Sequence, residues 1–467
     1  MKKHTQNVLD DDRVGRLLLR LSLPAFMGMF VMTLYNVIDT IFIGHYVGSL
    51  GIAGLSIVFP VQMLSLGIGQ MMGMGGASLI SRLLGARNIP RAEHAVGNAV
   101  VLSAVLAVIM TVVGLSNTNF WLRLMGSSES ILPYARDYMT IIVAGIIFPT
   151  VSITLNSLVR AEGNARVAMT AMIVGAVSNI ILDAVFIISL DMGIRGAALA
   201  TLIAQLMSLV YLVSFYISGN SYLKIYFRNM MPDFGILKAI LSIGVSSFAR
   251  TMAASLSVIL INRMLIVYGG DYAVSAFGII NRIMMFAVMP GLTVGQGLQP
   301  ILGFNYGARR FDRALRVLKI AITAATVICF GVFLLLYLAP EPIIRIFTAD
   351  ETLVAMASHA ARRVFLALYL IGFIMVGSLF FQSIGKARLS FVTSIARPFL
   401  FMIPLLFILS RFWQLEGIWL ALPISEVLTF LLTLILFIPQ VRKLKRAGLS
   451  LTGKVVGVKD ESIIGSN

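Results

Sequence analysis

Twelve long apolar stretches constrain this chain more than any other feature. Each is about 20 residues or longer, which is the length that an α-helix needs to cross a hydrocarbon core of ~30 Å. Only 12% of the residues are charged and the mean hydropathy is +0.93, whereas a soluble domain carries roughly 25% charged residues. The sequence therefore excludes a soluble enzyme and predicts an all-α integral membrane protein of twelve transmembrane helices. We place them at residues 17–44, 51–80, 94–116, 132–160, 167–190, 193–217, 236–268, 271–303, 314–339, 353–384, 389–410 and 415–438.

The net charge of +17 is a topology signal here. When the connections are assigned alternately to the two sides, most Lys and Arg residues gather on the side that holds both ends of the chain. The positive-inside rule then predicts a multi-pass protein of the cell (inner or plasma) membrane with both termini in the cytoplasm. The basic groups on that side include Arg82, Arg87, Arg91, Arg166, Lys224, Arg309, Arg310, Arg313, Arg316, Lys386, Arg388 and a tail from Arg442 to Lys459. No basic and aromatic patch remains for nucleic acid.

Short motifs of the first half recur in the second half at one constant residue spacing. We call this spacing the repeat offset and define it as the number of residues from Gly85 to Gly307. Gly85–Arg87 returns as Gly307–Arg309, and Gly163–Arg166 returns with one change as Gly385–Arg388. Tyr46–Gly48 returns more loosely as Tyr268–Gly270. Six helices in each half predict two six-helix bundles related by a pseudo-two-fold axis along the membrane normal, the architecture of a rocking transporter. The predicted divisions are an N-lobe at 1–217, a cytoplasmic linker at 218–235, a C-lobe at 236–440 and a cytoplasmic basic tail at 441–467.

Motifs for the common catalytic classes are missing from the sequence. The four histidines form no HExxH pair, and neither a GxxxxGK[ST] phosphate loop nor a GxSxG elbow occurs. The single cysteine, Cys329, excludes a disulfide framework and CxxC chemistry. We therefore expect no enzymatic activity and no cofactor.

Three acids, Asp39, Asp183 and Glu426, lie well inside the apolar stretches rather than near their ends. A charge at that depth is costly and marks a functional site by default. At ~1.5 Å per helical residue, Asp39, Asp183 and Thr201 share a depth near the outer face. Tyr35 and Asn179 each precede one of the aspartates by four residues and so share its helix face. The sequence predicts that these five residues form one polar pocket.

Two chemistries suit such a pocket, and the residues leave the choice open. Carboxylate, amide and hydroxyl oxygens are the donors that a hard cation such as Na⁺ prefers. Two close carboxylates also resist double ionisation, so one of them should hold a proton. Either ion could couple to a movement, for which Pro24 in the first helix is a candidate hinge. The structural alternatives are a polar helix cap at Asp39, interhelical hydrogen bonding by Asp183 and Asn179 that only joins their helix to a neighbour, and a fixed kink at Pro24.

The first half resembles the multidrug and toxic compound extrusion (MATE) family in three segments, Leu23–Gly44, Gly76–Arg82 and Arg160–Asn164. The resemblance covers essentially the whole chain. It implies a secondary antiporter that exports organic compounds, drugs and other xenobiotics in exchange for H⁺ or Na⁺ by alternating access. In the branch with an acidic N-lobe, the coupling ion is held by the residues that match Asp39, Asp183, Asn179 and Thr201 here.

The second half departs from that pattern. Ile261 and Leu405 stand at the repeat offset from the two aspartates. Arginines lie in or near the second-half helices, and we expect Glu426 to pair with one of them, in a structural network or a substrate cleft. The group consists of Arg250, Arg263, Arg282, Arg397 and Glu426. The basic bias favours anionic or zwitterionic cargo, so the alternative is a flippase or exporter of lipid-linked or anionic metabolites. A passive channel and an intramembrane enzyme are weaker alternatives. The expected partners are small organic substrates, the coupling cation and membrane lipid, and we expect a monomer.

Overall fold

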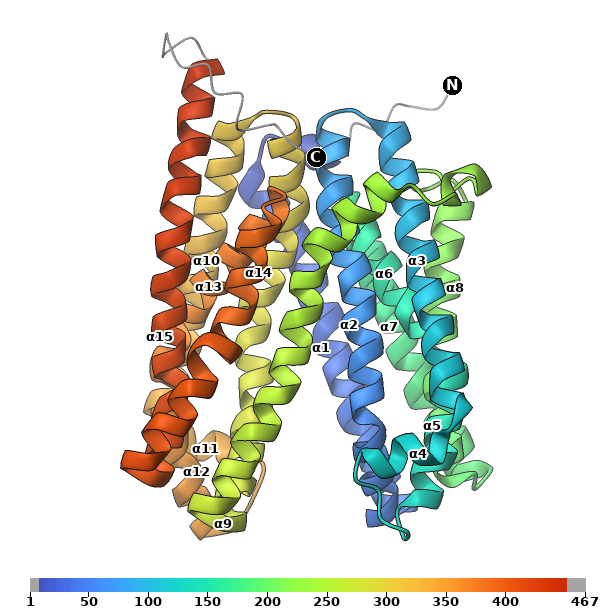
Figure 1. The fold of residues 1–467 in the computed structure, drawn as a ribbon, viewed down its shortest axis with the longest axis vertical. Coiled ribbons are helices and arrows are strands. Elements are labelled where there is room, and N and C mark those ends of the chain that lie inside the picture. The colour runs from blue at the N-terminus through green and yellow to red at the C-terminus, as the bar shows by residue number, and fades with distance from the viewer. Residues whose placement is uncertain (1–7, 452–467) are drawn as a thin grey trace. The chain divides into compact units, whose positions relative to one another are not determined.

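The computed structural model describes residues 8–451, and every regular element within that range is a helix (Figure 1). The N-terminal lysines 2 and 3, His4 and the basic tail beyond residue 451 lie outside the described residues. The first-half elements are η1 (Val8–Asp10), α1 (Val14–Tyr46), α2 (Ser49–Gly85), α3 (Ile89–Ser116), α4 (Thr118–Leu124), α5 (Leu132–Ala144), α6 (Ile147–Ala161), α7 (Ala165–Asp183), η2 (Ala184–Ser189) and α8 (Gly193–Ile217).

The remaining elements run through the linker and the second half. α15 continues through residues 441–451 and so includes the first part of the predicted tail. The elements are η3 (Phe227–Met230), α9 (Phe234–Gly307), α10 (Phe311–Leu338), α11 (Pro340–Ile344), α12 (Glu351–Val364), η4 (Phe365–Ala367), α13 (Leu368–Ser383), α14 (Ala387–Ile395), η5 (Ala396–Met402) and α15 (Ile403–Leu451).

Nine helical segments within the described residues are long and apolar enough to cross a membrane. A tenth span is formed if α5 and α6, which meet at a bend of 51°, are taken together. Two of the nine segments contain a break. α9 has a non-helical residue at Gly270 (φ 65°, ψ −163°), and α15 has one at Gln414 (φ 46°, ψ −124°). The length and apolarity of these helices make the chain a membrane protein.

The sequence repeat is matched by the backbone. Each of the three repeated segments contains a residue with left-handed φ at the same place, at Gly48 and Gly270, at Arg87 and Arg309, and at Gly163 and Gly385. Glycine adopts that conformation without steric cost, which explains its use in two of the three pairs. The first residues of α7 and α14, Ala165 and Ala387, are also separated by the repeat offset. Both helices are followed by a π-helical segment, η2 and η5.

The chain divides into two compact units. The first contains residues 8–10, Leu23–Leu84 and Asn88–Met252, so it includes the stretch 218–235 and the beginning of α9. The second contains Asp11–Ser22, Gly85–Arg87 and the described residues from Ala253 onward. The boundary in α1 falls between Ser22 and Leu23, next to Pro24.

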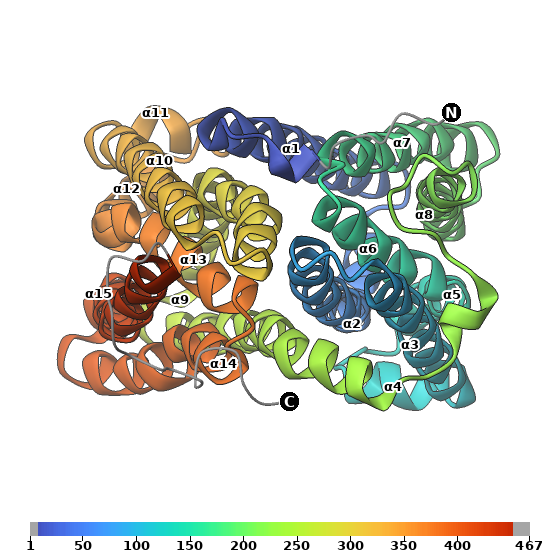
Figure 2. The same ribbon diagram turned by 90° about the horizontal axis from the view of Figure 1, so that it is seen from above.

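Within the first unit, α8 packs against α5, α6 and α7 (Figure 2). α1 approaches α7 closely at Gly28, where a Cβ would lie 2.9 Å from Met172 Sδ. Polar contacts join other helices of this unit, such as the 2.7 Å hydrogen bond between the Ser65 and Thr150 hydroxyls. Small residues and hydroxyl pairs of this kind are what hold helices together in lipid, where apolar burial alone gives little preference.

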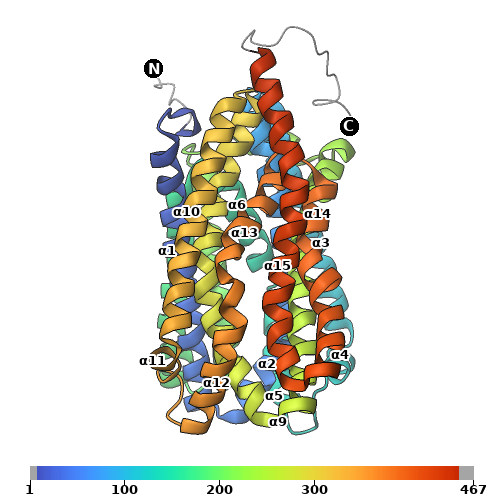
Figure 3. The ribbon, with the colours of Figure 1, turned by 90° about the vertical axis from the view of Figure 1, so that its left-hand side faces the viewer.

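Within the second unit, α10, α13 and α15 pack side by side (Figure 3). The core of this unit is apolar and includes the fully buried Phe365 and the nearly buried Trp419 and Ile261. Gly372 of α13 lies so close to α10 that a Cβ would lie 2.6 Å from the Ala325 carbonyl oxygen. The close contact requires glycine at this position.

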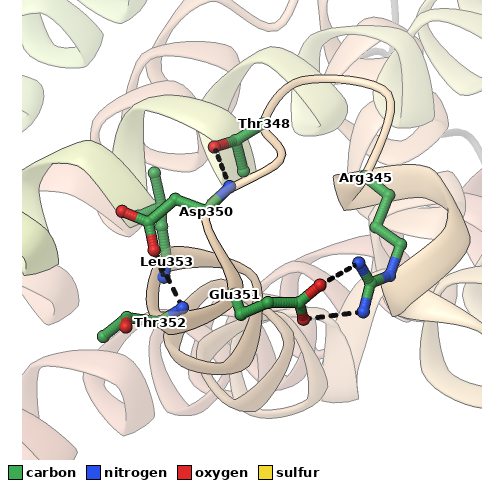
Figure 4. Close-up of polar contacts among 6 residues, drawn as sticks. All are labelled: Arg345, Thr348, Asp350, Glu351, Thr352 and Leu353. Carbon is green, nitrogen blue, oxygen red and sulfur yellow. Dashed lines mark hydrogen bonds and ion pairs between the residues drawn. The ribbon is translucent and has the colours of Figure 1, made fainter.

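The short loop before α12 is fixed by its own side chains (Figure 4). The Asp350 carboxylate caps α12 by accepting hydrogen bonds from the Thr352 and Leu353 N–H groups, at 2.8 and 3.2 Å. Arg345 forms a two-pronged ion pair with Glu351, at 2.6 and 2.8 Å. A capped N-terminus with an acid in its first turn explains why the helix begins at Glu351.

Candidate functional site

Asp39 of α1 and Asp183 of α7 face each other inside the first unit. Their carboxyl groups interact directly. Asp39 is 8% exposed and Asp183 is fully buried. α1 positions Asp39 one turn after the buried Tyr35. Asp183 is the last residue of α7, just before the π-helical segment η2, and such segments occur often at functional sites. The predicted meeting of two acids from separate helices is thus present in the structure.

Three of the four carboxyl oxygens of the acid pair have no other hydrogen-bond partner among the described residues. Apart from the contact between the two carboxyl groups, Oδ1 of Asp39 and both oxygens of Asp183 are buried and accept no hydrogen bond from the described residues. Two ionised carboxylates side by side in such a place would repel each other with no compensating charge. The arrangement is suited to holding a shared proton or a bound cation.

Asn179 and Thr201 extend the pair into a polar cluster. Asn179, 1% exposed, donates through Nδ2 to Thr201 Oγ1 of α8 at 3.4 Å. The Asn179 carbonyl oxygen Oδ1 is buried without a partner in the described residues. This oxygen lies one helical turn before Asp183 and is a neutral donor atom of the kind that binds Na⁺.

Tyr35 also belongs to the cluster, together with three residues that the sequence analysis did not select. Tyr35 is hydrogen-bonded to Gln205 of α8 and interacts electrostatically with Asp39. Tyr138 of α5, 1% exposed, interacts electrostatically with Asp39 and accepts a 3.1 Å hydrogen bond from Gln62 of α2. Gln205 follows Thr201 by four residues and shares its helix face, so the same spacing rule could have found it. No comparable signal pointed to Tyr138 or Gln62.

Pro24, the candidate hinge, lies inside the continuous helix α1. Its ring removes one backbone hydrogen bond from the helix. The division between the two units crosses α1 directly before Leu23 and Pro24. The structure thus places the proline where α1 passes from one unit into the other.

Glu426 of α15 pairs with Arg397 of η5 in the second unit, at 2.7 Å between Oε1 and Nη2. The Glu426 side chain is 5% exposed and that of Arg397 is 31% exposed. Of the other arginines that we considered, Arg250 belongs to the first unit, and Arg263 and Arg282 are exposed residues of α9. Glu426 therefore neutralises one arginine of the basic group.

A further buried acid lies outside the spans, at the end of α6. Glu162 Oε2 accepts hydrogen bonds from the Ser221 hydroxyl at 2.6 Å and from the Tyr222 N–H at 3.1 Å. Burial raises the pKa of Glu162 from 4.5 to about 7, although these hydrogen bonds oppose the shift. Glu162 thereby attaches the segment after α8 to the turn between α6 and α7.

Known proteins resemble this chain along most of its length. The MatE family model matches residues 24–185 and 246–408. The multidrug export protein MepA of Staphylococcus haemolyticus (strain JCSC1435) is 26% identical to it, over 94% of this chain and 96% of that protein.

Solved structures agree with this similarity. A crystal structure of MATE in the bent conformation is 27% identical, with a TM-score of 0.89 over 96% of this chain and 99% of the other. A MOP superfamily transporter from Pyrococcus furiosus is 28% identical, with a TM-score of 0.89 over 95% of this chain and 100% of the other. For that transporter, the reverse polarity of its binding pocket was taken to suggest a different function.

Proposed function

This chain belongs to the MatE family of membrane transporters, and from that premise we propose that it is a multidrug efflux antiporter driven by H⁺ or Na⁺. Alternating access exchanges the inward ion for an outgoing organic compound. The relatives described as multidrug export proteins support the cargo class. The ion is the transported co-substrate, and Asp39, Asp183, Asn179 and Thr201 hold it, with Tyr35 beside them.

One observation carries the proposal of ion coupling. Three buried carboxylate oxygens on Asp39 and Asp183 accept no hydrogen bond from the described protein beyond the contact between the two groups. An unsatisfied charge pair at this depth destabilises the protein unless a proton or a cation occupies it. A protein that only needed to join α1 to α7 could do so with neutral side chains, which cost less in lipid. The retained charges favour a group that is loaded and unloaded.

Loading this cluster biases a conformational equilibrium only if the ion binds one state more tightly than the other. α1 offers a route, because it carries Asp39 and also contains Pro24 at the division between the two units. A bend at Pro24 would move Asp39 relative to Asp183. A similar MATE protein has been solved in a bent conformation, which supports a change of shape in this chain as well. We propose that ion binding favours one shape of α1 and that cargo favours the other.

The proposed membrane arrangement has twelve spans. It takes α5 and α6 as one span and divides α9 at Gly270 and α15 at Gln414 into two spans each. Six spans in each half then form two bundles related by an axis along the membrane normal, with the lobes, linker and tail divided as the sequence predicts. Both termini face the cytoplasm in this arrangement. One chain supplies both bundles, so the functional unit is a monomer.

A second candidate function differs from the first in the charge of the exported compound. The second-half arginines and the reverse polarity ascribed to the Pyrococcus furiosus transporter favour an exporter of anionic metabolites or a flippase of lipid-linked ones. However, Glu426 neutralises Arg397, which reduces that bias. We therefore place drug efflux first.

Efflux assays in inside-out vesicles separate these functions. The test imposes an H⁺ or Na⁺ gradient across the vesicle membrane and then adds ethidium. It follows both the accumulation of ethidium in the vesicles and the loss of the ion gradient. Asp39→Asn and Asp183→Asn preserve shape and remove the charge. Asp191→Asn is the matched control, since Asp191 is an exposed acid two helical turns after Asp183 in the sequence. Its left-handed backbone (φ 48°) also suits asparagine.

Coupled antiport predicts gradient-dependent ethidium uptake in the parent and the control, and none in the two cluster variants. Uptake that ignores both gradients would contradict antiport and indicate a passive channel. If ethidium is not moved while an anionic dye dissipates the gradient, the anionic-cargo function is favoured instead.

A further inference from the structure

Four arginines surround a cavity in the second unit, at the beginning of α10. The cavity has a volume of about 410 Å³. Its remaining walls are Phe311, Gly448 near the end of α15, and the two acids Asp12 and Asp312. The arginines, which we call the arginine pocket, are Arg309, Arg310, Arg313 and Arg316.

The arginine pocket has an excess of positive charge. Among the described residues that line it, four are arginines and two are acids. Arg313 is the most buried of the four, with a side chain 11% exposed. It donates to the Asp11 carbonyl oxygen, and its Nη1 lies 3.9 Å from an Asp12 oxygen. Asp12 is 97% exposed, so water screens this weak pairing. Arg309 and Arg316 are exposed and appear in no ion pair among the described residues that line this cavity.

The arginine pocket lies at the level of lipid headgroups. The stretch from Ile320 to Leu338 contains no charged side chain, and at ~1.5 Å per residue it spans a hydrocarbon core. Arg316 lies about one helical turn before that run, and Arg309 lies in the turn just before α10 begins. The positive-inside rule assigns this end to the cytoplasmic leaflet, where anionic lipids are enriched.

The beginning of α10 has no side-chain cap, whereas the matching helix of the first half, α3, has one. α3 begins after Asn88 (φ −91°, ψ 71°), whose side chain accepts a 3.2 Å hydrogen bond from the Arg91 N–H. α10 begins after Arg310, which stands at the repeat offset from Asn88 and has nearly the same backbone (φ −87°, ψ 65°). Arginine has no acceptor atom, and α10 has no side-chain cap. The first half thus caps its helix internally, whereas the second half replaces the cap with a cation beside a cavity.

We propose that the arginine pocket binds the phosphate group of an anionic phospholipid. A phosphodiester offers oxygens that can accept from several guanidinium groups at once. It would also satisfy the uncapped N–H groups of α10. The source is a lipid because the pocket adjoins an apolar span that would contact the acyl chains. The binding is independent of the proposed antiport, since no residue of the Asp39 cluster takes part.

The test is native mass spectrometry of the full-length protein equilibrated with equal amounts of phosphatidylglycerol and phosphatidylcholine of identical chains. The parent should retain phosphatidylglycerol preferentially. Arg309→Gln/Arg316→Gln should lower that preference roughly 10-fold or more, because each cation near the surface contributes appreciably to anionic-lipid binding. The matched control is Arg91→Gln/Arg166→Gln, which removes two exposed arginines from the first turns of α3 and α7.

Arg310→Asn is a second variant that should remain folded, since it copies the cap of α3 while removing one cation. It should also lose the preference. Inorganic phosphate added at millimolar concentration should leave phosphatidylglycerol bound. Equal retention of the two lipids by the parent, or an equal loss in the control, would overturn the proposal. Displacement by inorganic phosphate would assign the pocket to a soluble anion and overturn the lipid source.

Discussion

The two halves of this chain share backbone turns but treat buried acids differently. The first half contains three buried carboxylates, at Asp39, Glu162 and Asp183. Aliphatic residues stand at the repeat offset from them, at Ile261, Ile384 and Leu405. Ile261 belongs to the apolar core of the second unit, and Leu405 packs against that core. The halves therefore keep one scaffold while only the first retains ionisable groups at these places.

The second half has its own buried acid, and it is compensated. Glu426 lies 2.7 Å from Arg397, so the charge of the pair is cancelled within the protein. Among the described residues, Asp39 and Asp183 interact with each other and with neutral neighbours. A compensated pair holds helices in place, whereas an uncompensated pair must take up a proton or a cation. The proposed ion loading therefore concerns the first half, whereas the buried acid of the second half is paired.

Neutralising either aspartate should give the largest effect. We expect Asp39→Asn and Asp183→Asn to reduce gradient-driven ethidium export to the background of empty vesicles. The asparagine amide that replaces the carboxylate cannot bind and release the coupling ion. The free energy of unfolding of each variant, measured thermally in detergent, should stay within about 1 kcal/mol of the parent value, because the substitution also removes the repulsion between the two acids. Parental efflux rates in both variants would end the proposed distinction between the halves.

Breaking the second-half pair should affect stability instead. Glu426→Gln leaves the Arg397 charge without its partner and should lower the free energy of unfolding by about 2–4 kcal/mol, toward the low end because Arg397 is 31% exposed. The double variant Glu426→Gln/Arg397→Gln should recover most of this loss. Thermal or denaturant unfolding in detergent measures both. A stable single variant with an altered range of exported dyes would instead place Glu426 in contact with cargo.

Glu162 adds a pH dependence to the stability of the first half, where the second half has Ile384 at the repeat offset. Burial raises its pKa in the folded protein from 4.5 to about 7, so the folded state holds a proton that the unfolded chain has released. Its contribution to stability is therefore fully present below about pH 4.5 and is lost as the pH rises through about 7. When the pH is raised from 5.5 to 8, the free energy of unfolding of the parent should fall by about 2 kcal/mol more than that of Glu162→Gln. Identical pH profiles of unfolding would contradict this.

The neutral ligands should give the smallest changes. Thr201→Val and Asn179→Leu remove one oxygen donor each, and we expect the apparent affinity for the coupling ion to fall roughly 3- to 10-fold with maximal efflux largely retained. Efflux measured against increasing ion concentration detects this shift. Ser208→Ala is the control, because Ser208 is a buried hydroxyl of the same helix that contacts Ser152. A similar shift in the control would assign the effect to packing.

Depth along helices accounts for much of what the sequence could predict. Charge and length rules located Asp39, Asp183 and Thr201 at one level, and four-residue spacing added Tyr35 and Asn179. These arguments work because polar groups in lipid are few and costly. Tyr138 and Gln62 were missed because an apolar stretch shows no difference between its lipid-facing and protein-facing sides.

Backbone breaks inside apolar stretches were also beyond the sequence. The sequence places Asp183 beside η2 and Arg397 in η5, but a single polar residue in an apolar stretch does not indicate a π-helical turn, and the bent pair α5 and α6 was predicted as one straight span. The choice of Arg397 as the partner of Glu426 likewise depends on how α15 and η5 pack in three dimensions.

Ion release on cargo binding tests the central claim most directly. The purified parent in weakly buffered detergent is titrated with ethidium at pH 7, while a pH indicator follows protons and ²²Na⁺ follows sodium. We predict that the parent releases one of these ions on binding ethidium, that Asp191→Asn does the same, and that Asp39→Asn and Asp183→Asn release neither. Ion release from both cluster variants equal to that of the parent would contradict a coupling site at Asp39 and Asp183.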